Sequence, residues 1–119
     1  MRHRRYQDLK VWQVAVDLAV ETYGFTARFP SEERFGLTAQ ARRAAVSIPC
    51  NIAEGQGRGH RGAFQNHLSI ARGSLQELET LFVIAERLDY TDADRWETPW
   101  EKCDHIGRML TQLRRSINA

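Results

Sequence analysis

The chain has 119 residues and a formal net charge of only +2 at pH 7. This length fits a single domain over residues 1–119, with a core large enough to fold without disulfides or metal. The two cysteines are too few for a secreted disulfide scaffold. No apolar run is long enough for a signal peptide or a membrane span. We therefore expect a reduced, cytoplasmic protein with no membrane association.

The first helix is predicted from about residue 7 to residue 27, with Asp8 as an early-turn acid or cap. Its polar residues form one narrow stripe of Gln13, Asp17 and Glu21. A helix in a monomeric bundle normally has a broader wet face. We therefore expect this helix to be buried on two sides, one of them against another subunit.

The second helix is predicted from about residue 37 to residue 54. Pro49 lies inside it, and its ring would clash with the carbonyl group of Ala45, so we expect a kink. Ser47 is close enough to help satisfy the freed backbone groups. Three glycines then end the helix and give a flexible loop: Gly55, Gly57 and Gly59.

Polar side chains recur every three or four residues along this second helix, on one face. They are Gln40, Arg43, Ser47, Asn51, Glu54 and Arg58. A solvated face is usually made of long Lys and Glu side chains, whereas Ser and Asn favour caps and turns. Two interpretations stay open. Gln40, Ser47, Asn51 and Glu54 form a structural stripe that satisfies the kink and the helix end, or some of these groups contact a ligand.

The third helix is predicted from about residue 63 to residue 88. The fourth is either one kinked helix from Asp92 or a short turn followed by a helix from Pro99. Four amphipathic helices joined by short loops predict an all-α, antiparallel up-and-down four-helix bundle with a Pro-kinked second helix.

Neither catalytic nor metal-binding motifs are evident. Di-iron bundles use Glu-x-x-His, which does not occur here. Cys103, Asp104 and His105 are adjacent on a helix and so splay apart. We expect no metal, no cofactor and no catalytic residue. An enzyme that uses the neighbourhood of His67, Ser74 and Glu77 is another alternative.

All but two of the 17 basic residues are arginine. Arginine suits phosphate, carboxylate and base edges, although a GC-rich genome produces the same bias. The candidates for phosphate contact are Arg42 and Arg43 on the second helix, and Arg58 and Arg61 around the Gly-rich loop. A merely solvated loop is the other interpretation of Arg58 and Arg61.

Several motifs together resemble one known family, over nearly the whole chain. They are Leu9-x-x-Trp12, Phe29-Pro30-x-x-Glu33-x-Phe35-Gly36-Leu37, Gln40-x-Arg42-Arg43-Ala44-x-x-Ser47-Ile48-x-x-Asn51-Ile52-Ala53-Glu54-Gly55-x-Gly57-Arg58, Ile70-Ala71-x-Gly73-Ser74-Leu75-x-Glu77-Leu78 and Met109-Leu110-x-x-Leu113. The chain is similar to the four-helix bundle proteins encoded in intervening sequences of bacterial 23S ribosomal RNA, also called the S23 family.

This resemblance implies an up-and-down bundle that assembles as a ring-like homopentamer. It also implies kinship with the accessory protein of diversity-generating retroelements, which binds nucleic acid and its reverse transcriptase. We therefore expect a non-catalytic, oligomeric scaffold associated with RNA or DNA. The alternative is a protein-interaction adaptor with no nucleic-acid role.

Overall fold

The computed structural model describes residues 6–91 and 93–118, with the backbone alone for residues 93–97. It contains four α-helices: α1 (Lys10–Thr26), α2 (Leu37–Gly57), α3 (Arg61–Arg87) and α4 (Ala93–Asn118). Two short 3-10 helices precede α1 and α2, namely η1 (Tyr6–Asp8) and η2 (Ser31–Glu33). The described residues form no strand. The predicted all-α four-helix fold is confirmed.

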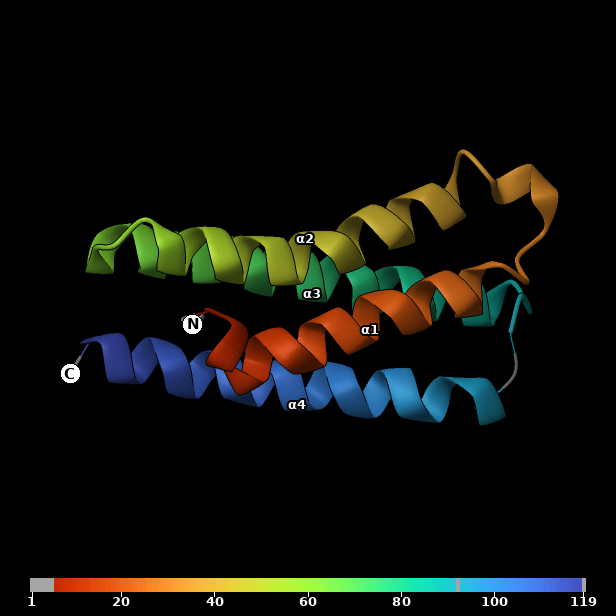
Figure 1. The fold of residues 1–119 in the computed structure, drawn as a ribbon. Coiled ribbons are helices and arrows are strands. Elements are labelled where there is room, and N and C mark those ends of the chain that lie inside the picture. Colours follow the sequence, from red (N-terminus) through yellow and green to blue (C-terminus); the bar gives the residue numbers. More distant parts are fainter. Residues whose placement is uncertain (1–5, 92, 119) are drawn as a thin grey trace.

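The helices form an elongated bundle with extents of 43 × 24 × 22 Å. Helices α1 and α3 each pack against α2 and α4, and the most extensive contact joins α2 to α3. Helices α1 and α3 therefore lie on a diagonal of the bundle. Figure 1 shows that the chain reverses direction between successive helices, so α1 begins and α4 ends at the same end of the bundle.

The core follows from apolar residues that recur every three or four positions on each helix. On α3 the fully or nearly fully buried residues include Leu68, Leu75, Leu78 and Phe82. Full burial of each such side chain stabilises the fold by about 1.5–3 kcal/mol. On α2 the buried positions include three small residues, Ala41, Ala44 and Ala45. Small side chains let the neighbouring helices approach closely.

The start of α1 differs from the sequence prediction. Leu9 is extended, with ψ 122°, and separates the 3-10 turn of η1 from α1. The helix therefore begins at Lys10 rather than at about residue 7. Leu9 occupies the N-cap position and makes no side-chain cap hydrogen bond. The prediction that Asp8 is an early-turn acid or the cap of this helix was wrong, because Asp8 belongs to η1.

Helix α2 continues past its predicted end at Glu54 and stops at Gly57. Gly55 is buried, and its bare Cα faces His67 and Phe64 of α3. Its missing side chain serves close helix packing rather than helix termination. The left-handed turn falls later, at Gly59, where φ is +80°. Pro49 is buried inside the helix, and the predicted kink there stays a prediction.

The start of α2 is fixed by a carboxylate. The backbone N–H of Leu37 donates to Glu33 Oε1 at 2.9 Å, and the Tyr90 hydroxyl donates to Glu33 Oε2 at 2.9 Å. Both hydrogen bonds, the backbone one first, lower the pKa of Glu33 below its ordinary value of 4.5. Glu33 thereby joins the α1–α2 connection to the α3–α4 connection.

Helix α4 is one continuous helix from Ala93, with Pro99 inside it. The alternative start at Pro99 was wrong. Asp92, the other predicted start, lies outside the described residues.

Part of α1 is left uncovered by this chain. Val20 is 68% exposed, although the sequence pattern places it on an apolar face. The described residues therefore do not bury α1 on two sides, and its burial against another subunit stays a prediction.

Candidate functional site

A continuous polar network crosses the contact between α2 and α3. The hydroxyl groups of Ser47 and Ser74 share a hydrogen bond of 2.8 Å. The Asn51 amide donates to the carbonyl oxygen of Ser47 at 2.8 Å and to its hydroxyl at 3.0 Å. On its other side, Asn51 Oδ1 lies 2.9 Å from Nδ1 of His67. Because an amide oxygen only accepts, Nδ1 of His67 carries the proton.

The network ends at an exposed ion pair. Glu54 Oε2 lies 2.8 Å from the Arg58 guanidinium and 4.0 Å from His67 Nε2. The Arg58 hydrogen bond, followed by the electrostatic effect of His67, lowers the pKa of Glu54 below 4.5. Both side chains of the Glu54–Arg58 pair are more than half exposed. Exposed pairs of this kind contribute little to stability, so Arg58 is available to other anions.

The structure brings together three of the four residues assigned to the structural stripe. Ser47, Asn51 and Glu54 join the network, whereas Gln40 is exposed near the start of α2 and stays outside it. Ser47 does not turn to the Pro49 region as expected, because its hydroxyl faces Ser74 on α3.

The three residues of the enzyme alternative are not brought together. Ser47 and Asn51 stand between Ser74 and His67 in the network. Ser74 and Glu77 line a surface groove, but His67 is not among the residues that line it.

Arg42 is committed to the packing of α1 on α2. Its Nε donates to the Thr26 hydroxyl at 2.9 Å, and its Nη2 donates to the Tyr23 carbonyl oxygen at 3.3 Å. Its guanidinium also lies 4.6 Å from the centroid of the Tyr23 ring. Arg42 therefore binds the end of α1, where the orphan carbonyl groups of a helix attract cations.

The other three predicted phosphate-contact residues are exposed. Arg43 lies on α2, Arg58 follows the end of α2, and Arg61 is the first residue of α3. Arg43 and Arg58 are separated by roughly 22 Å along the helix axis, from the rise per residue. The four predicted arginines therefore do not form one cluster. Arg58 and Arg61 stand at one end of the bundle, and Arg43 stands further along α2.

Arg43 belongs to a groove of about 810 Å³ on the α1, α2 and α3 surface. Basic, aromatic and short polar side chains line it: Tyr23, Arg34, Arg42, Arg43, Ser47, Cys50, Asn51, Ser74 and Glu77, among others. Glu77 supplies the one carboxylate among these lining residues. Among the charged residues of the groove, arginines therefore outnumber carboxylates by three to one.

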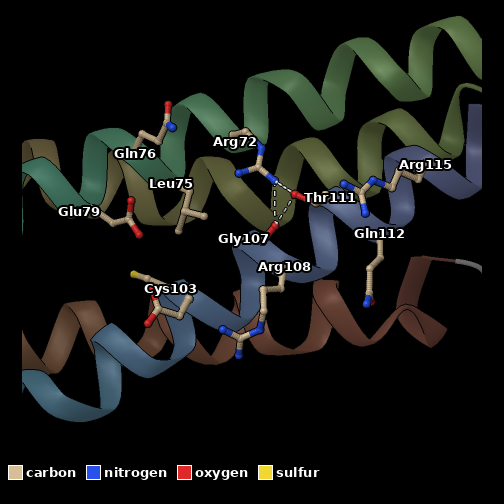
Figure 2. Close-up of a pocket in the computed structure, with 11 residues that line it drawn as sticks. Arg72, Leu75, Gln76, Glu79, Cys103, Gly107, Arg108, Thr111, Gln112 and Arg115 are labelled. Atoms are coloured by element: carbon tan, nitrogen blue, oxygen red, sulfur yellow. Dashed lines mark hydrogen bonds between the residues drawn. The ribbon is translucent and has the colours of Figure 1, made fainter.

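A second pocket of about 460 Å³ lies between α3 and α4, as Figure 2 shows. Arg72 reaches from α3 to α4, and its Nη2 donates to the Gly107 carbonyl oxygen at 2.8 Å and to the Thr111 hydroxyl at 2.6 Å. Glu79 and Cys103 lie at the end away from Arg115 (Figure 2). Burial, followed by the charge of Asp104, raises the pKa of Glu79. This arrangement clamps α3 to α4.

Cys103, Asp104 and His105 point apart. Cys103 is buried, whereas Asp104 and His105 are exposed, and burial raises the pKa of the Cys103 thiol to about 12. Within the described part of the chain, no three His, Cys, Asp or Glu side chains gather as metal ligands would. None of the described helices has the length and apolarity that a bilayer crossing needs.

Two contacts made by α3 were not predicted from the sequence. His67 contacts Asn51 of the α2 stripe, and Arg72 contacts Gly107 and Thr111 of α4. His67 and Arg72 sit on α3 with no local motif around them, because their partners lie far away in the sequence. The one sequence feature that points to these contacts is a glycine on the facing helix. Gly55 faces His67, and Gly107 lies beside Arg72.

Comparison with known proteins supports the fold and identifies the family. No curated protein matches the chain. A crystal structure of a protein of unknown function from the S23 ribosomal protein family of Bacteroides thetaiotaomicron is similar, with a TM-score of 0.78 at 24% identity. The similarity covers 87% of this chain and 97% of that one. The family model described as 23S rRNA-intervening sequence protein matches residues 7–112, so the chain belongs to that family.

Proposed function

We propose that the protein is a non-catalytic, cytoplasmic homo-oligomer that serves as a nucleic-acid-associated scaffold. The observation that carries this proposal is the grouping of Arg58 and Arg61 at the junction of α2 and α3. Both are exposed, and Arg58 is held only by an exposed ion pair with Glu54. A phosphate group can replace that carboxylate at little energetic cost.

Repetition of this junction around a ring compensates for the small net charge of one chain. A net charge of +2 per subunit is modest, but an oligomer presents the Arg58 and Arg61 pair once per subunit. Clustered charge of one sign focuses the electrostatic field and attracts a polyanion. The proposal therefore depends on assembly.

The exposed apolar residues support assembly through unlike surfaces. Val20 on α1 is 68% exposed, Ile70 and Ile84 on α3 are 44% and 42% exposed, and Leu88, the C-cap residue of α3, is 50% exposed. Helices α1 and α3 lie on a diagonal of the bundle, so their outer faces point in different directions. Contact between two different faces is head-to-tail, and such contacts form a ring when the rotation from one subunit to the next closes. The proposal of five subunits rests on the family resemblance. The proposal of a reverse transcriptase as protein partner rests on the same resemblance.

Assembly is tested by light scattering of the eluted protein. We expect a single species heavier than the 13.7 kDa chain, and we expect Val20→Glu to dissociate it because a charge cannot be buried unpaired in an interface. Gln40→Glu adds the same charge at another exposed position and should leave the mass unchanged. A monomeric wild type would overturn the assembly.

Nucleic-acid contact is tested with paired arginine variants. Arg58→Ala with Arg61→Ala should weaken binding uniformly across sequences and reduce its salt dependence. The control is Arg108→Ala with Arg115→Ala, which removes the same charge from the α3–α4 pocket. If both pairs of substitutions weakened binding equally, binding would depend on the net charge of the protein and not on the position of Arg58 and Arg61. Unchanged affinity in the first pair would remove Arg58 and Arg61 from the site.

A further inference from the structure

Phe35 is the one phenylalanine that this chain leaves in water. Its side chain is 85% exposed, whereas Phe29 and Phe82 are buried and Phe25 and Phe64 pack against the core. Exposure of a whole aromatic ring gives up the stabilisation that its burial would contribute. Packing within the described part of the chain does not account for a ring at this position.

An arginine lies over this ring. The Arg34 guanidinium is 4.9 Å from the Phe35 ring centroid, and Arg34 also lines the groove of about 810 Å³. Phe35 does not itself line the groove, but it directly follows Arg34, which does. A guanidinium plane and an aromatic face together make a flat surface of mixed cationic and apolar character.

A second stacked pair lies in the same groove. Tyr23 is 47% exposed, and the Arg42 guanidinium lies 4.6 Å from its ring centroid. Between these pairs and α3 the groove offers Arg43 for charge, and Ser47, Asn51 and Ser74 for hydrogen bonding. A volume of this size lies within the ~300–1,000 Å³ typical of ligand pockets.

Arginines beside exposed aromatic rings are the elements that recognise unpaired bases. Bases stack on Phe and Tyr rings and on guanidinium planes, while cations in the same groove contact the phosphates. In duplex nucleic acid the base faces are already stacked on one another and are not available to such rings. The charge of the groove, three arginines against Glu77 alone among its lining residues, favours a polyanion as the occupant.

We propose that this groove binds single-stranded nucleic acid, with a base stacked on Phe35 and phosphates contacted by Arg34 and Arg43. The inference rests on the proposed nucleic-acid function and specifies its ligand class. It places base contacts at the α1–α2 end of the groove, whereas the Arg58 and Arg61 junction contacts phosphate alone.

A pair of probes separates stacking from charge. The first is a labelled oligothymidylate, and the second is an abasic strand with the same length and charge. Stacking predicts that the oligothymidylate binds roughly 5- to 100-fold more tightly. Equal binding of both strands would overturn base stacking and leave the nucleic-acid function standing. Binding of neither strand at low salt would overturn the single-strand assignment, and binding of structured RNA and duplex DNA would then decide the nucleic-acid function.

Two substitutions at Phe35 test the ring itself. Phe35→Trp keeps a stacking face and should retain oligothymidylate affinity, with its own fluorescence quenched on binding. Phe35→Leu keeps apolar bulk but has no aromatic face, so its preference for oligothymidylate over the abasic strand should disappear. A Phe35→Leu protein that keeps this preference would contradict the assignment. A Phe35→Leu protein that falls apart into monomers while Phe35→Trp does not would instead place this ring against a second copy of the chain.

Discussion

Gly55 of α2 packs directly against His67 of α3. A Cβ atom added to Gly55 would stand 2.6 Å from the Cβ atom of His67 and 3.3 Å from the Phe64 ring. Two Cβ atoms cannot lie 2.6 Å apart, so either α2 or α3 would have to move. The close contact of α2 with α3 at this point therefore depends on the absence of a side chain at position 55.

Gly55→Ala should destabilise the protein by about 1–3 kcal/mol, because overpacking forces the helices apart. Alanine has a higher helix propensity than glycine and would by itself stabilise α2. A net loss of stability would therefore identify overpacking as the dominant effect. Gly73→Ala is the matched control, since a Cβ atom added to Gly73 of α3 would meet no atom of another element within 4 Å, and the change should stabilise by up to about 1 kcal/mol. Denaturant unfolding measures both. A stabilised Gly55→Ala protein would contradict the packing described.

Asn51→Ala should break the polar network at its centre. The change leaves His67 Nδ1 and the Ser47 hydroxyl each without the partner that Asn51 supplied. Unsatisfied polar groups in a partly buried site cost about 1–3 kcal/mol. Gln40→Ala, in the same sequence stripe but exposed, should change the free energy of unfolding by less than about 0.5 kcal/mol. Similar losses in the two variants would mean that the network has no special stabilising role.

Arg42 and Arg43 are neighbours in sequence with different expected roles. Arg42→Ala removes the hydrogen bonds to Thr26 and Tyr23 and should lower the free energy of unfolding by about 1–2 kcal/mol. Arg43→Ala should leave stability within about 0.5 kcal/mol of the wild type, and should weaken nucleic-acid binding. Thermal and denaturant unfolding of the two variants separate these roles. Equal stability of the two would contradict the clamp assigned to Arg42.

Glu33 should make stability depend on pH in the acid range. Its pKa is lowered by folding, so the stabilisation is present above the ordinary value of 4.5 and is lost as the pH falls through the lowered folded value. Glu33→Gln keeps an oxygen to accept from Leu37 but does not titrate. We expect the stability difference between the wild type and Glu33→Gln to be largest near neutral pH and to shrink below pH 4.5. A difference that stays constant over this range would contradict the proposed linkage.

The bundle was predictable because each helix repeats apolar residues at helical spacing. The helix ends were less predictable. A glycine stops a helix or permits a close contact, and only the neighbouring helix decides which of these applies at Gly55. Leu9 raises the same difficulty at the start of α1, because its extended backbone leaves no mark in the residue pattern.

The candidate site was predictable in part. The α2 stripe was visible because Ser47, Asn51 and Glu54 share one face of one helix. Its partners His67 and Ser74 belong to α3, and helical spacing on α2 carries no information about them. Arg42 and Arg43 look alike in the sequence, and only the position of the α1 end makes one of them structural.

The decisive experiment is binding of labelled structured RNA, duplex DNA and single-stranded DNA by the sized oligomer, titrated from low to physiological salt. The proposed function predicts saturable binding, with the logarithm of the association constant falling linearly with the logarithm of the salt concentration. For a single strand, the slope of this line should be roughly −0.7 for each phosphate that the protein contacts. Unpaired strands should bind more tightly than the duplex. Absence of binding to all three, even at low salt, would contradict the nucleic-acid role and would favour a protein-interaction adaptor.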